Sequence, residues 1–152
     1  MEARISVWRA SEFEVTIWLG PDSARRFLAR DPAEVQAAFV PGPCLLQVDS
    51  ILRQAGQHAD VSLGYLWVWL NSDGMAVVRL DEHCEHFARD PARAGMAGEV
   101  GGFPRWDGVP FAGLKGEPFA VPAADAVTAE QATNVLSYWL ANGEWWPGLA
   151  WD

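Results

Sequence analysis

The stretch VSLGYLWVWL (Val61–Leu70), followed by NSDG (Asn71–Gly74) and MAVVRL (Met75–Leu80), decides the fold. Side chains alternate between the two faces of a strand, and both faces of Val61–Leu70 are apolar. One face carries Leu63, Tyr65, Trp67 and Trp69, and the other carries Leu66, Val68 and Leu70. A strand that is apolar on both faces is expected at the centre of a sheet. Asn71–Gly74 predicts a hairpin turn, with Met75–Leu80 as the antiparallel partner.

Shorter apolar or alternating runs predict further strands on both sides of this hairpin. They are Arg4–Trp8, Glu12–Trp18, Cys44–Val48, Phe111–Gly113, Pro118–Val121 and Leu149–Trp151. The pattern of Ile51–His58 is ambiguous between helix and strand. Asp90–Pro110 is rich in Gly, Pro and Ala, and it is predicted to form a long loop.

Capping signals predict two main helices. Asp31–Glu34 has the order of an N-cap residue, a proline and a capping-box Glu, and a shorter helical piece is expected before it at Ser23–Ala29. Thr128–Gln131 is a second capping box, and it opens a helix to Ala141 with Gly143 in the C-cap. The sequence therefore predicts one α+β domain over residues 1–152. It has a largely antiparallel sheet with two main helices packed on one face.

The charge balance favours some partners over others. Twenty Asp and Glu face eleven Lys and Arg, giving a formal net charge of -9. This charge argues against direct nucleic-acid binding, which requires a basic face, and favours a basic protein partner. An acidic surface that only maintains solubility is the alternative. The longest apolar stretch is far below the ~20 residues that span a bilayer. The N-terminus lacks a signal-peptide core, so we expect no membrane and a cytoplasmic location.

Nine tryptophans are many for 152 residues. Tryptophan fills cores first, and it is also enriched at the centres of protein interfaces. We expect one to three of the nine at the surface. Trp139, on the apolar stripe of the last helix, and Trp151, in the final strand, are predicted to be structural, whereas Glu144 and Trp145 are predicted not to be.

The polar cluster Asp81–His86 is the main candidate for chemistry. It offers two His and one Cys, but zinc sites usually combine two separated ligand pairs, so no metal site is predicted. It also contains His-x-Glu, half of the zinc deaminase signature, without the Pro-Cys-x-x-Cys half downstream. Cys84 could pair with His83 or His86, but a nucleophile and its base usually come from separate elements. We therefore predict no catalytic site and no cofactor.

The last forty residues carry a resemblance. The strand GEPFAVP (Gly116–Pro122) leads to the Thr128 capping box, then the helix, NGEWWP (Asn142–Pro147) and a terminal Leu149–Trp151. This order resembles the first-numbered immunity-protein family of bacterial polymorphic toxin systems. Members typically have a Thr-Gly-x-Arg-Pro-like turn where this chain has NGEWWP, which lacks the Arg. The resemblance implies a cytoplasmic protein that neutralises a cognate toxin, often a nuclease or a nucleic-acid deaminase.

Function is therefore predicted to be toxin neutralisation by occlusion of the toxin's active site. Two alternatives stay open: a small metal-dependent enzyme that uses the Asp81–His86 cluster, and a structural or adaptor subunit unrelated to toxins. The candidate toxin-binding residues lie in the acidic turn, the Gly/Pro-rich loop and the segment after the last helix. They are Glu82, Glu85, Trp106, Asp107, Glu144 and Trp145.

Overall fold

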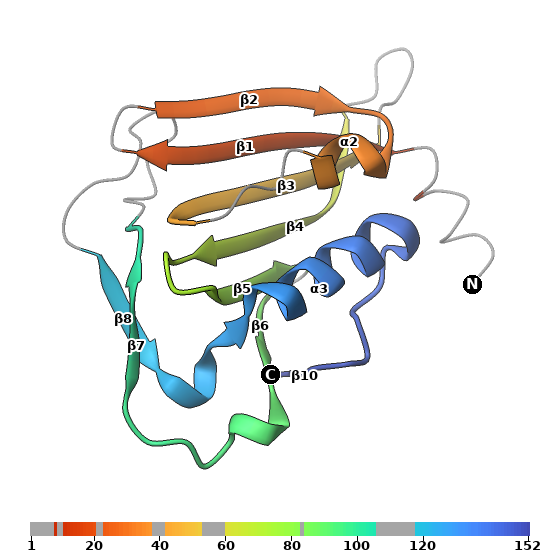
Figure 1. Ribbon diagram of the computed structural model, residues 1–152. Coiled ribbons are helices and arrows are strands. Elements are labelled where there is room, and N and C mark those ends of the chain that lie inside the picture. The colour runs from red at the N-terminus through yellow and green to blue at the C-terminus, as the bar shows by residue number, and fades with distance from the viewer. Residues whose placement is uncertain are drawn as a thin grey trace.

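An antiparallel sheet forms the centre of the molecule (Figure 1). The computed structural model describes residues 8, 11–20, 23–37, 42–52, 60–82, 84–105 and 118–152. Within them, seven strands follow the order β10-β6-β5-β4-β3-β1-β2, and β9 also pairs with β5. The strands are β1 Glu12–Gly20, β2 Ser23–Ala29, β3 Cys44–Leu52, β4 Val61–Leu70, β5 Met75–Asp81, β6 Glu85–Arg89, β9 Val127–Thr128 and β10 Ala150–Trp151.

The predicted central hairpin is confirmed. β4 lies between β3 and β5, and the side-chain oxygen of Asn71 accepts main-chain hydrogen bonds from Asp73 and Met75 at 3.0 and 2.9 Å, which fixes the turn. Strict alternation fails only at Leu63. The pairing with β3 shifts between Ser50 and Ile51, so Leu63 is the extra residue of a bulge. Leu63 therefore packs on one face of the sheet and Tyr65 on the other.

Helices cover one face of the sheet, as predicted. α2 (Pro32–Ala37) and α3 (Ala129–Asn142) lie on the same side in Figure 1. An N-cap is present at both helices: Asp31 accepts from the main chain of Ala33, and Thr128 forms a reciprocal capping box with Gln131. Gly143 closes α3 in the left-handed conformation. The core between sheet and helices includes Val35, Leu66, Val68, Leu136 and Trp139.

A two-stranded sheet, β7 (Glu99–Phe103) with β8 (Phe119–Pro122), covers part of the opposite face. Its apolar side chains complete a second cluster with those of the main sheet: Trp18, Leu45, Trp67, Trp69, Val77 and Phe103 are buried there. This second layer explains why β4 is apolar on both faces. It also corrects the prediction of a loop over Asp90–Pro110, since that region contains β7 and a short 3-10 helix at Pro91–Arg93.

Two other predictions are wrong. Ser23–Ala29 is the edge strand β2 instead of a helical piece, because pairing with β1 satisfies its backbone where a seven-residue helix would be marginal. Trp8, the one described residue of the expected strand Arg4–Trp8, has helical backbone. The ambiguous segment is strand through Leu52, and its remainder lies outside the described residues, as does the expected strand Phe111–Gly113.

Candidate functional site

Strand register places a row of acidic residues across five strands of the sheet. Glu14 of β1 pairs with Asp49 of β3, Asp49 with Tyr65 of β4, Tyr65 with Asp81 of β5, and Asp81 with Glu85 of β6. Directly paired residues point to the same face, and strands lie about 4.8 Å apart. The acidic row, as we call these five residues, is therefore about 19 Å long by that spacing.

The acidic row shares its face with the β7–β8 layer but lies beyond the apolar cluster that this layer covers. The row includes Tyr65, which contacts that cluster at its margin. Glu14 and Glu85 are exposed, and Asp49, Tyr65 and Asp81 are half-buried. Like charges directly opposite one another destabilise a sheet.

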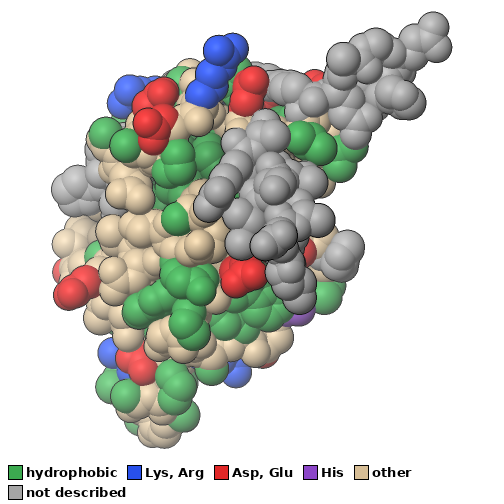
Figure 2. All heavy atoms as spheres, turned by 90° about the vertical axis from the view of Figure 1, so that its right-hand side faces the viewer, with side chains coloured by type: hydrophobic (Ala, Val, Ile, Leu, Met, Phe, Trp, Pro, Cys, Tyr) green, Lys and Arg blue, Asp and Glu red, His purple; other side chains and the backbone are tan. Residues whose placement is uncertain are grey.

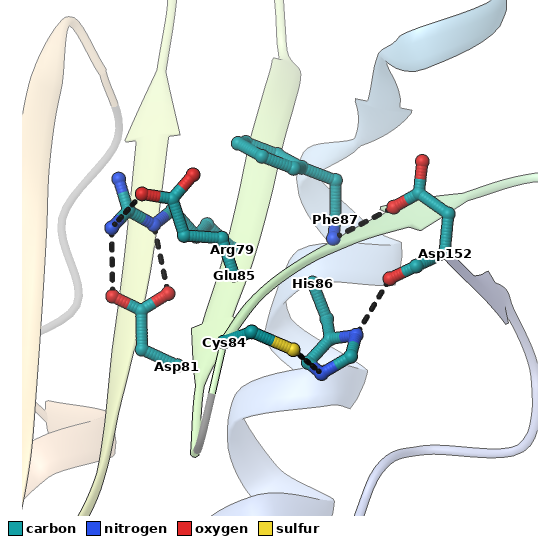
Figure 3. A network of polar contacts seen from close by, with 7 residues as sticks. All are labelled: Arg79, Asp81, Cys84, Glu85, His86, Phe87 and Asp152. Carbon is teal, nitrogen blue, oxygen red and sulfur yellow. Dashed lines mark hydrogen bonds and ion pairs between the residues drawn. The ribbon is translucent and has the colours of Figure 1, made fainter.

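Arg79 holds the β5–β6 end of the row in place. Its guanidinium lies 5.6 Å from the ring centroid of Trp67, and it binds Asp81 through two contacts of 2.8 Å (Figure 3). A further ion pair of 2.9 Å joins it to Glu85. Two carboxylates are thereby fixed side by side. Because a single guanidinium neutralises only one formal charge, the group of three keeps a formal negative charge.

An open pocket of about 370 Å³ lies at this end of the row. It is lined by Ser62, Gly64, Tyr65, Asp81, Glu82, Cys84 and Glu85. Asp49 accepts a 2.7 Å hydrogen bond from the hydroxyl of Ser62 beside it. Burial raises the pKa of the Tyr65 phenol above its usual value, and the charge of Asp49 adds to the rise. The phenol therefore stays protonated and can donate a hydrogen bond among the carboxylates.

Cys84 lines this pocket, and its thiol is directed at His86, whose side chain lies on the other face of β6 from Glu85. The thiol of Cys84 lies 3.2 Å from Nε2 of His86, and Nδ1 of His86 lies 2.6 Å from the main-chain oxygen of Asp152 (Figure 3). The expectation that sequence neighbours would not form a Cys/His pair is therefore wrong as to geometry. Cys84 lies just before β6, and its thiol is directed at the ring of His86.

The structure places four of the six predicted binding residues. Glu82 and Glu85 line the pocket, and Glu144 is exposed just after α3. Trp145 is half-buried, with its ring 4.6 Å from that of His86. The remaining two, Trp106 and Asp107, lie outside the described residues.

Three tryptophans are half-buried where one to three were expected at the surface. Trp145, Trp146 and Trp151 pack against the helix-side core, and the other five described tryptophans are buried. Figure 2, which views the molecule from the right-hand side of Figure 1, shows hydrophobic side chains gathered next to carboxylates. Trp151 donates to the main chain of Trp146 at 3.2 Å, which supports the prediction that Trp151 has a structural role.

Two features of the described part of the chain concern metal binding and membrane spanning. No group of three or more His, Cys, Asp or Glu side chains is placed there to hold a metal ion. His83, one of the two His of the Asp81–His86 cluster, lies outside it. None of its helices is long and apolar enough to cross a membrane.

Comparisons with family models, curated proteins and solved structures find no match to this chain. The resemblance to immunity proteins therefore stays a prediction from the C-terminal motif. Sequence reasoning grouped Asp81, Glu82 and Glu85 in one polar cluster but did not join Glu14 and Asp49 to it. The polar positions of the alternating pattern Glu12–Trp18 gave one signal for Glu14. The cross-strand register that aligns the row is a property of the folded sheet.

Proposed function

We propose that this protein is a cytoplasmic immunity protein that binds a basic toxin domain, a nuclease or a nucleic-acid deaminase, through the acidic row. The row is the observation that carries the proposal. It presents four carboxylates and one phenol along about 19 Å of a rigid sheet, using the usual strand spacing. The net charge of -9 and the C-terminal motif support the same function.

The chemistry of the row fits a cleft that binds phosphates. Enzymes acting on nucleic acid bind the phosphates of the backbone with Lys and Arg. A line of carboxylates can pair with the same side chains in place of the phosphates. Arg79 fixes Asp81 and Glu85 before binding, so less side-chain freedom is lost on association. Tyr65 in the middle of the row adds an aromatic surface of the kind that anchors interfaces.

The decisive experiment is co-expression with the product of the adjacent gene. We expect that product to be toxic alone, and we expect this chain to restore growth and form a complex of nanomolar affinity, about -12 kcal/mol. Survival, complex formation and inhibition of the purified toxin would be measured together. A neighbour that is harmless, or that kills equally well with this chain present, would overturn the immunity proposal and favour an adaptor role.

Charge-neutral variants test the surface itself. Asp49→Asn and Glu85→Gln should each slow association, because steering by complementary charge acts mainly on the association rate. Glu99→Gln, an exposed carboxylate of β7 outside the row, is the matched control and should leave the rate unchanged. Added salt should slow association of the wild type more than it speeds dissociation. Equal effects of all three substitutions would place the interface elsewhere.

A further inference from the structure

We propose that Cys84 is a nucleophilic thiol, with His86 as its base, that exchanges with small positively charged disulfides. This chemistry goes beyond partner binding. Two independent observations carry it. The first is the contact of 3.2 Å between the Cys84 thiol and Nε2 of His86. The second is the open pocket of about 370 Å³ that Cys84 lines.

The hydrogen-bond partners determine where the protons lie. The main-chain oxygen of Asp152 can only accept, so Nδ1 of His86 carries the proton that bridges the 2.6 Å between them. In the neutral imidazole Nε2 then has a lone pair, which points at Cys84. The thiol donates to Nε2, and this nitrogen is placed to take its proton. Cys84 is thus placed as a nucleophile, His86 as its base, and the main-chain oxygen of Asp152 as the group that orients the base.

Several contacts hold the orienting group and the ring. The main-chain N–H of Phe87 donates to the carboxylate of Asp152 at 3.1 Å, and Arg89 binds the same carboxylate at 2.8 Å. Pairing of β10 with β6 brings this end of the chain beside His86. Trp145 lies against the imidazole, with ring centroids 4.6 Å apart. Because segments distant in sequence form these contacts, the dyad geometry depends on the folded state.

The surroundings of Cys84 select the charge of the reagent. The pocket carries the carboxylates of Asp81, Glu82 and Glu85, and Arg79 is the cation paired with two of them. Three formal negative charges thus stand against one positive charge. A cationic reagent is concentrated near such a surface and an anionic one is repelled, with an effect that salt screens.

The reaction is a thiol–disulfide exchange. The thiol of Cys84 passes its proton to Nε2 of His86, and the sulfur attacks one sulfur of a diamine disulfide such as cystamine. A new S–S bond forms to Cys84 while the disulfide bond of cystamine breaks. The released aminothiolate takes the proton from Nε2. The products are a mixed disulfide on the protein and one free aminothiol.

The other cysteine is an internal control. Cys44 is 1% exposed, and burial raises the pKa of its thiol to about 11. Its thiolate is scarce near neutral pH, so it should not react in the folded chain. Any adduct on the native protein is therefore assigned to Cys84 by peptide mapping.

The test uses three disulfides of similar size on the full chain: cystamine (cationic), 2-hydroxyethyl disulfide (neutral) and 3,3′-dithiodipropionate (anionic). Intact mass and peptide mapping give the rate of adduct formation near neutral pH. We expect one adduct, on Cys84, with cystamine faster than the anionic disulfide by about five-fold or more at low salt. High salt should reduce this ratio. Equal rates for the cationic and anionic reagents would overturn the charge selection.

Variants separate the base from the surface charge. His86→Gln should slow all three reagents by about ten-fold, since a positioned base contributes at least that much. Glu85→Gln should reduce only the rate advantage of the cationic disulfide over the anionic one. Glu99→Gln should leave all three rates unchanged. If near-ultraviolet circular dichroism shows that His86→Gln is misfolded, the wild-type protein alone tests the dyad. Its native Cys84 must react faster with the neutral disulfide than the same cysteine in denaturant. A native rate equal to or below the denatured rate, or a folded His86→Gln with the wild-type rate, would refute the dyad.

Discussion

Trp139 is the largest side chain that the core buries completely. Its ring packs edge-on against Trp8, with centroids 4.9 Å apart, and lies 6.3 Å from Phe13. This aromatic group joins α3 to β1 and to the segment that precedes it. The side chain therefore links parts of the chain that the sequence separates by more than a hundred residues.

Truncation of Trp139 should destabilise the protein strongly. Trp139→Ala is expected to cost about 3–5 kcal/mol of unfolding free energy, because it leaves a large cavity in a closed core. Glu144→Ala, an exposed position just beyond α3, should change it by less than about 0.5 kcal/mol. Half-buried Trp145 should fall between them. Denaturant unfolding measures all three, and similar losses at Trp139 and Glu144 would contradict this assignment of burial.

The Cys44 thiol predicts a pH dependence of stability. Burial raises its pKa from the ordinary 9.0 to about 11 in the folded state, so the folded protein holds this proton more tightly than the unfolded chain does. The resulting stability is fully present below pH 9.0 and is lost as the pH rises through about 11. The wild type should therefore lose more stability over this range than Cys44→Ala. Parallel pH profiles from denaturant melts would contradict the shift.

At the scale of elements, the capping box at the start of α3 joins three parts of the fold. Thr128 and Gln131 exchange hydrogen bonds of 2.8 and 3.1 Å, and Gln131 also donates to Asp90 at 2.9 Å. That last bond is the main reason why the pKa of Asp90 is lowered. Thr128 belongs to β9 as well, where it pairs with Met75. The helix start is thereby fixed to the sheet and to the segment before β7.

Loss of this cap should be measurable. Thr128→Ala is expected to cost about 1 kcal/mol, because it leaves a main-chain N–H of the first turn without its acceptor. Thr128→Ser keeps the hydroxyl and should recover most of that loss. Thermal melts of the two variants, read beside the wild type, measure the difference. A serine variant as unstable as the alanine variant would show that the methyl group matters more than the cap.

At the scale of the whole molecule, one surface of the sheet brings like charges together. Glu14 and Asp49 are directly paired, and the net charge of the chain is -9. A strong excess of one charge destabilises a compact state through self-repulsion. Binding sites commonly retain such local costs because the partner relieves them.

Screening and neutralisation should therefore both stabilise the free protein. The melting temperature is expected to rise as salt is added from low ionic strength. Asp49→Asn keeps the acceptor for Ser62 and should raise the unfolding free energy by up to about 0.5 kcal/mol. It should also respond less to salt than the wild type. A melting temperature that falls with salt would show that attractive pairs, such as those of Arg79, dominate the surface.

The sequence by itself determined most of the elements. β4 and the hairpin to β5 followed from apolar alternation and turn residues, and α3 from its capping box and apolar stripe. These signals are local, because side-chain period and capping act within a few residues. Ser23–Ala29 was misassigned because a short segment has little preference of its own and takes its conformation from β1.

Only the tertiary structure decided how the polar residues are grouped. Asp49 and Glu85 are far apart in the chain, and the register of three strand pairings places them in one row. Cys84 and His86 are close in sequence, but the main-chain oxygen that orients the imidazole comes from Asp152, next to β10. Register depends on how whole strands bury their apolar faces, so it follows from the complete core and not from any local pattern.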